Sequence, residues 1–172
     1  GDIPEKMPAR NIVLEGSFYV DGTQVKELSY TIEYYKNNVK QDADTEVVKK
    51  VVQVLEPNTI TVDKSKINTT NKYLGYNFEK IEPQVIPDTV NSGFVIKIYY
   101  AAEIYTIEYD LDGGTSTEEN PENYTIEDSF VLKAPEKEGH TFIGWTGSNG
   151  EEPEETVTIS KGTTGNKQYK AN

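Results

Sequence analysis

The sequence predicts a mainly β protein, with little helix, that is built from small modules in tandem. Three observations predict this class. Apolar and polar residues alternate along most of the chain, turn-forming residues separate these runs, and one strand-like string occurs twice. Alternation is the pattern of a strand with one buried face, and a repeat period longer than a hairpin indicates tandem units.

The alternating runs are predicted to be strands. They cover Asn11–Val20, Leu28–Tyr35, Phe94–Tyr100, Tyr105–Leu111 and Thr156–Ser160. Turn signals separate them: Asp21-Gly22, Asn37-Asn38, Asn91-Ser92-Gly93, Asp112-Gly113-Gly114 and Ser148-Asn149-Gly150.

Three other segments admit a helical reading. Thr45–Glu56 has apolar residues at helical spacing, but it is so rich in valine that we expect a strand. Asp63–Ile67 is predicted to form a short helical turn, because Asp63 can cap it. Glu136–Gly139 is expected to form another.

The internal repeat places the boundary between modules. Tyr30-Thr-Ile-Glu-Tyr-Tyr35 recurs as Tyr105-Thr-Ile-Glu-Tyr-Asp110, and Leu74-Gly-Tyr-Asn-Phe78 is echoed by Glu138-Gly-His-Thr-Phe142. We therefore expect one module over residues 29–102 and a second over residues 103–172. Residues 1–28 are expected to be the C-terminal remnant of a preceding module with its connector. Almost no linker separates the two modules, which predicts a stiff pair.

The composition limits the partners. The chain has 172 residues, 17 basic and 29 acidic, with a formal charge of −12. Such a charge repels nucleic acid and anionic lipid, so neither nucleic-acid binding nor membrane insertion is expected. Twelve tyrosines are expected to fill thin cores with their rings while their hydroxyls stay in water. The absence of cysteine excludes disulfides and thiolate metal sites.

No motif for catalysis is present, and we expect no enzyme, cofactor or metal. The chain lacks a phosphate-binding glycine loop, a Gly-X-Ser-X-Gly elbow and a His-Glu-X-X-His motif. His140 is the only histidine, and we interpret it as a partly buried aromatic residue rather than a ligand. The acidic stretch Glu151–Glu155 is interpreted as a solvated turn.

Two further segments have a functional and a structural interpretation. The Asp110–Glu119 loop has oxygen-bearing side chains that calcium could use, but we favour a tight turn in which Asp112-Gly113-Gly114 supplies positive φ. Trp145 is predicted to anchor the core of the second module, with a carbohydrate-stacking platform as the alternative.

Paired tyrosines end two of the predicted strands, Tyr34-Tyr35 and Tyr99-Tyr100. One member of each pair faces inward and the other outward, because side chains alternate along a strand. Tyr35 and Tyr99 are the predicted outward members. We favour a cross-strand pair between them, and they are also the candidates for contact with a glycan or protein ligand.

Residues 29–101 resemble the mucin-binding-protein (MucBP) type of repeat. The matching residues are Thr31-Ile-Glu-Tyr-Tyr35, Leu74-Gly-Tyr-Asn-Phe-Glu-Lys-Ile81 and Ile96-Lys-Ile-Tyr-Tyr100.

Residues 104–172 resemble the Listeria–Bacteroides repeat, also called the internalin B-repeat. The match rests chiefly on Ile107-Glu-Tyr-Asp-Leu-Asp-Gly-Gly114, Gly139-His-Thr-Phe-Ile-Gly-Trp145 and Ile159-Ser-Lys-Gly162. His140 departs from the tyrosine that is usual there. Both resemblances imply small β-grasp-like modules in an elongated tandem arrangement, on secreted or wall-anchored proteins of Gram-positive bacteria.

The resemblances imply a non-catalytic stalk and adhesion region on the cell surface, anchored to the cell wall in the full-length parent. The expected partners are a host glycoprotein such as mucin or another extracellular protein, and the chain is expected to be a monomer within a tandem array. Two alternatives remain open: a specific mucin- or glycan-binding module, and an accessory region of a secreted carbohydrate-active enzyme.

Overall fold

The computed structural model describes residue 13 and residues 15–172, and it is mainly β. Short 3-10 turns, η1 (Asp42–Asp44) and η2 (Lys64–Lys66), are the helical elements of this part of the chain. Its strands are β1 (Val25–Lys36), β2 (Val39–Lys40), β3 (Glu46–Gln53), β4 (Thr59–Thr61), β5 (Tyr76–Glu82), β6 (Thr89–Asn91), β7 (Phe94–Ala102), β8 (Tyr105–Asp110), β9 (Asn123–Tyr124), β10 (Phe130–Val131), β11 (Trp145–Gly147), β12 (Gly150–Glu154), β13 (Thr158–Ile159) and β14 (Lys167–Ala171).

The elements β1 to β7 form what we call the first lobe. Its sheet runs in the order β2-β1-β7-β5, with β3 paired to the same strand β1. The strands β1 and β7 are parallel, with Ile32 opposite Ile96, whereas β3 and β5 are antiparallel to their neighbours. A separate ribbon pairs β4 with β6.

The first core lies on one face of this sheet. Alternate residues of β1 and β7 are buried there, and Ile60 and Val90 of the β4–β6 ribbon lie in the same cluster. The buried residues of the two central strands are Leu28, Tyr30, Ile32, Tyr34, Ile96, Ile98 and Tyr100. The period-2 pattern of the sequence therefore produces this core directly.

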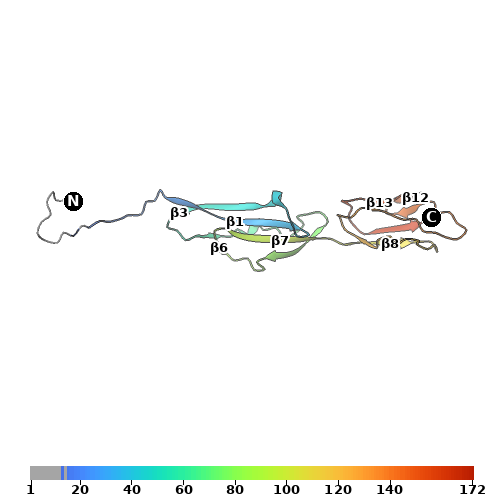
Figure 1. Ribbon diagram of the computed structural model, residues 1–172, viewed down its shortest axis with the longest axis horizontal. Coiled ribbons are helices and arrows are strands. Elements are labelled where there is room, and N and C mark those ends of the chain that lie inside the picture. The colour runs from blue at the N-terminus through green and yellow to red at the C-terminus, as the bar shows by residue number, and fades with distance from the viewer. Residues whose placement is uncertain (1–12, 14) are drawn as a thin grey trace.

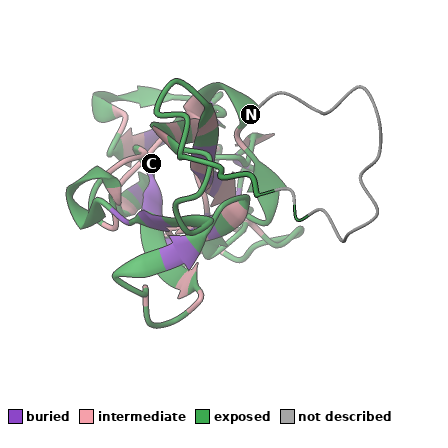
Figure 2. Cartoon of the chain, turned by 90° about the vertical axis from the view of Figure 1, so that its left-hand side faces the viewer, coloured by how far each residue is buried: buried purple, intermediate pink, exposed green. Residues whose placement is uncertain are grey.

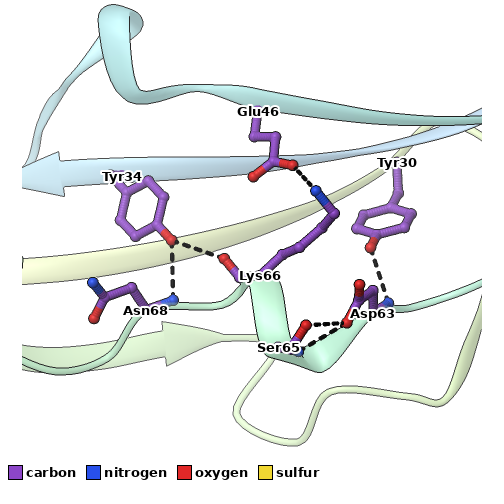
Figure 3. Close-up of polar contacts among 7 residues, drawn as sticks. All are labelled: Tyr30, Tyr34, Glu46, Asp63, Ser65, Lys66 and Asn68. Atoms are coloured by element: carbon purple, nitrogen blue, oxygen red, sulfur yellow. Dashed lines mark hydrogen bonds and ion pairs between the residues drawn. The ribbon is translucent and has the colours of Figure 1, made fainter.

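Hydroxyl groups of core tyrosines form hydrogen bonds with the long connection between β4 and β5 (Figure 3). The Tyr30 hydroxyl accepts a hydrogen bond from the Asp63 amide at 3.0 Å, and the Tyr34 hydroxyl accepts one from the Asn68 amide at 3.0 Å. The Tyr100 hydroxyl donates to the Asn68 carbonyl oxygen at 2.9 Å. The expectation that core tyrosines keep their hydroxyls in water is wrong for these three, because each tyrosine is buried and its hydroxyl bonds to a backbone group of the connection.

The elements β8 to β14 form the second lobe. Its sheet runs β12-β11-β14-β8-β9, and β10 pairs with β13. Here too the first strand is parallel to the last, with Tyr109 of β8 opposite Tyr169 of β14. The repeated Tyr-Thr-Ile-Glu-Tyr string thus lies in β1 of one lobe and in β8 of the other, and each of these strands is parallel to the last strand of its lobe.

Each lobe has its own hydrophobic cluster, and the chain passes from β7 to β8 through Glu103 and Ile104. The two sheets lie one after the other along the longest axis of the molecule (Figure 1). An end-on view shows buried segments enclosed by exposed ones (Figure 2).

Several predictions about elements are confirmed. Thr45–Glu56 contains β3, as its valine content favoured. Asp63 caps η2, because its side chain accepts a hydrogen bond from the Ser65 amide. Four of the five alternating runs also contain strands: Leu28–Tyr35, Phe94–Tyr100, Tyr105–Leu111 and Thr156–Ser160.

Three predictions are wrong. Residues 13 and 15–20 form no strand, and the side chains of Phe18 and Val20 are exposed, so the alternation there does not mark a buried face. The rest of Asn11–Val20 lies outside the described residues, as do residues 1–12 and 14 of the expected remnant module. Glu136–Gly139 is not helical, because Gly139 has φ +73° and closes a β-turn. Glu151–Glu155 is not a turn, because Gly150–Glu154 forms β12, which pairs with β11.

Candidate functional site

Tyr35 and Tyr99 form the predicted cross-strand pair. They are opposite each other in the parallel register of β1 and β7, and their rings stack with centroids 4.8 Å apart. Both are half-buried on the outer face of the sheet, whereas Tyr34 and Tyr100 are buried in the core. The predicted division into inward and outward tyrosines is confirmed.

Charged neighbours hold both hydroxyls of this pair. The Tyr35 hydroxyl donates to Glu33 at 2.7 Å, and the Tyr99 hydroxyl donates to Glu82 at 3.0 Å. The bond to Glu33 raises the pKa of Tyr35 to about 12. The Lys80 ammonium lies 4.5 Å from the centre of the Tyr99 ring. These contacts explain the positions of Tyr35 and Tyr99 by interactions within the sheet. A role of the two tyrosines in binding a ligand stays a prediction.

The Asp110–Glu119 loop forms the predicted tight turn. Asp112 and Gly113 have φ of +52° and +79°, and the Gly114 amide donates to the Leu111 carbonyl oxygen at 2.9 Å, which is the geometry of a type I′ turn. The Asp112 carboxylate pairs with Lys137 at 3.0 Å. Within the described residues, no group of three or more His, Asp or Glu side chains is placed to hold a metal ion.

His140 is exposed, so its interpretation as a partly buried aromatic residue is wrong. It follows Gly139 at the outside of the β-turn, where no neighbouring element covers it, and its Nδ1 lies 2.9 Å from the Glu138 carbonyl oxygen. The turn borders a surface cavity of about 670 Å³. Its apolar lining includes Leu111, Pro135 and Phe142.

Trp145 is fully buried in the second core, which confirms the predicted anchor. Its ring lies 5.5 Å from the Phe142 ring and 5.9 Å from the Tyr109 ring, measured between centroids. No ring face is available to stack on a sugar, so the platform alternative is wrong.

A contact between the lobes was not predicted by the sequence patterns. Ile126, in the loop between β9 and β10 of the second lobe, packs against the core cluster of the first lobe. It lies over Gly75, where an added Cβ would be 2.7 Å from the Ile126 Cδ1 atom. Only a residue without a side chain fits between the loop and the backbone there.

Polar bonds surround this apolar contact. The Tyr76 hydroxyl donates to the Glu127 carboxylate, and the Glu103 amide donates to the Gly75 carbonyl oxygen at 2.9 Å. Burial, together with the bond to Glu127, raises the pKa of Tyr76 to about 12. We call Gly75, Tyr76, Ile126 and Glu127 the joint.

The loop that carries Ile126 is held rigid within its own lobe. The Asp128 carboxylate accepts hydrogen bonds from the Thr125 amide at 2.7 Å and the Thr125 hydroxyl at 3.0 Å. The Gly162 amide donates to the Ile126 carbonyl oxygen at 2.7 Å. Ile126 is therefore presented to the first lobe by a preformed loop.

The second lobe coincides with a known repeat. Residues 105–171 match the family model of the Listeria–Bacteroides repeat domain. This match confirms the resemblance predicted for that part of the chain, and the family is found in bacterial surface proteins. The MucBP resemblance of the first lobe is not shown by it. No curated protein and no solved structure matches the chain.

The Listeria–Bacteroides repeat also contains the loop of the joint. Ile126 and Glu127 stand out in no sequence motif, because their partners lie some fifty residues earlier in the chain. Gly75, in the Leu74–Phe78 string, was the one sequence signal of this contact.

Among the residues that the structure describes, no helix has the length and apolar character that a membrane span requires.

Proposed function

We propose that this chain is a non-catalytic stalk region of a bacterial cell-surface protein, in which tandem β-grasp-like modules form an elongated, stiff unit. The joint is the observation that carries the proposal. In a stiff spacer, each module must hold a fixed orientation relative to the next. A linker of two residues does not fix that orientation by itself, because its backbone bonds can still rotate. The joint opposes that rotation, because Ile126 would lose its burial and Tyr76 its carboxylate partner if the lobes turned apart.

The parallel pairing of first and last strands in both lobes supports the β-grasp-like assignment. The repeat family supports an extracellular surface location, and anchoring to the cell wall belongs to the proposal.

Residual dipolar couplings test the stiffness. If the lobes form one body, both fit a single alignment tensor of one magnitude. Ile126→Ala removes apolar contact at the joint and is expected to give the two lobes different tensor magnitudes. Ile104→Ala is the matched control, since Ile104 lies in the same linker region but is 69% exposed. Different tensor magnitudes in the parent chain would contradict the stalk.

Adhesion to host mucin is the second part of the proposal. The half-buried Tyr35–Tyr99 pair offers aromatic edges on an exposed sheet face. Saturable binding to immobilised mucin that is lost in the Tyr35→Ala/Tyr99→Ala double variant would assign the contact to this face. Binding that persists in a correctly folded double variant would place it elsewhere, and no binding by the parent would leave a spacer alone.

A further inference from the structure

The second lobe carries a turn with the same geometry as the turn that the joint covers. In the first lobe, the Tyr76 amide donates to the Tyr73 carbonyl oxygen at 3.2 Å, and Gly75 has φ +73°. In the second lobe, the His140 amide donates to the Lys137 carbonyl oxygen at 3.0 Å, and Gly139 also has φ +73°. The two turns lie in the echoed strings that begin at Leu74 and Glu138.

The two turns differ in what covers them. Ile126 fills the space beside Gly75, and Tyr76 is only 8% exposed. A Cβ added to Gly139 would meet no atom within 4 Å, and His140 is exposed. The positive φ explains a glycine at both positions, but only the first has a neighbour pressed against it.

A cavity lies beside the uncovered turn. Besides Lys137, His140 and Phe142, it is lined by Leu111 and Pro135, so an aliphatic side chain would find apolar partners there. The volume of about 670 Å³ exceeds that of a single isoleucine and leaves room for the flanking loop.

From these observations we infer that the Lys137–His140 turn and its cavity form a docking site for the Ile126-type loop of another repeat module. The inference rests on the stalk function, and it extends that function by naming the surface through which a further module is held. The occupant is a preformed loop with an aliphatic side chain at its tip, because that is what covers the equivalent turn in this chain.

The charge at the rim determines which such loop fits best. Asp112, Glu136 and Glu138 line the cavity, and Lys137 is already paired with Asp112. In the joint, by contrast, the Lys36 ammonium lies 5.2 Å from the centre of the Tyr76 ring, near the site that receives Glu127. The second site therefore favours a basic residue after the aliphatic one, where the joint has a glutamate.

An extended chain tests the inference. A second copy of residues 102–172, carrying Glu127→Lys in that copy, is joined after Asn172 directly or through four or eight Gly/Ser residues. The amide signals of Gly139 and His140 in the original copy are then followed by NMR. We expect these amide signals to shift, relative to those of the parent chain, in at least one of the three extended chains. They should return to their positions in the parent chain when Ile126→Ala is added in the appended copy.

Two controls separate docking from mere proximity. Ile104→Ala in the appended copy removes the same atoms from an exposed position and should leave the shifts in place. An appended copy with its native Glu127 should dock in a smaller fraction of molecules. Unchanged Gly139 and His140 signals at all three linker lengths, or shifts that survive Ile126→Ala, would overturn the inference.

Loss of docking at the Gly139 turn and loss of stiffness between the original lobes give different experimental results. The original joint is present in every extended chain, and its dipolar couplings report on the stalk separately. A rigid joint with an uncovered Gly139 turn would overturn the docking site and leave the stalk standing.

Discussion

At the scale of single residues, aromatic side chains decide how these small lobes are filled. A module of this size buries a smaller fraction of its surface than a large domain does, so each large buried ring contributes a larger share of the core. In the first lobe, Tyr30, Tyr34 and Tyr100 add backbone hydrogen bonds to their packing. Composition and alternation predict that such tyrosines are buried, but the partners of their hydroxyls depend on the path of a connection that has no periodic pattern.

Replacement of Trp145 by alanine is expected to destabilise the second lobe by about 3–5 kcal/mol, because it removes the largest fully buried side chain. Chemical denaturation followed by circular dichroism measures the loss. Ile143→Ala, at a neighbouring residue that is 56% exposed, should change the free energy of unfolding by at most about 0.5 kcal/mol. Equal stability of Trp145→Ala and the parent would show that the ring does not anchor this core.

At the scale of elements, the sequence predicts strands well where one face is buried. The strands β3 and β8 lie within segments that alternation or valine content predicts to be strands, and β1 and β7 contain such segments and extend beyond them. The same pattern fails over residues 15–20, which form no strand and leave Phe18 and Val20 exposed. The prediction of a helical turn over Glu136–Gly139 is wrong because a glycine with positive φ is found both where a helical turn ends and within a β-turn.

The corner between β1 and β2 is expected to weaken in acid. Hydrogen bonds from Lys40 and Tyr35 lower the pKa of Glu33 below its ordinary value of 4.5. The folded state therefore holds this proton less tightly than the unfolded state. The stability that results is fully present above pH 4.5 and is lost as the pH falls through the lower folded pKa.

Glu33→Gln removes that titration, so its free energy of unfolding should fall less than that of the parent between about pH 5 and pH 3. Urea titrations at several pH values measure the difference. Glu27→Gln is the control, because Glu27 lies on the same strand as Glu33 and its ion pair with Lys49 of β3 is more than half exposed. Parallel pH profiles for the parent and Glu33→Gln would contradict the assignment.

At the scale of the whole molecule, the repeat predicts two units but not how they meet. The contact joins Gly75 and Tyr76 to Ile126 and Glu127, and nothing in the local sequence of either pair requires the other. Contacts of this kind depend on how two folded lobes are placed relative to each other. The periodicity of single strands carries no information about that placement. A short linker predicts stiffness only in general terms, whereas the joint gives it specific atoms.

Alanine at the two equivalent glycines measures the contribution of the joint. Gly75→Ala and Gly139→Ala both force a side chain into the same φ of +73°, which costs about 1–2 kcal/mol. Only at Gly75 does the new methyl group also collide with Ile126. This collision either costs a further amount of about 1–3 kcal/mol of folding free energy through overpacking, or it pushes the lobes apart. Urea denaturation followed by circular dichroism should therefore show a larger loss for Gly75→Ala, and dipolar couplings should show separate alignment of the lobes in that variant alone. Equal losses at the two glycines, with one shared alignment tensor in both variants, would mean that Ile126 yields without cost and that the lobes are held by their linker.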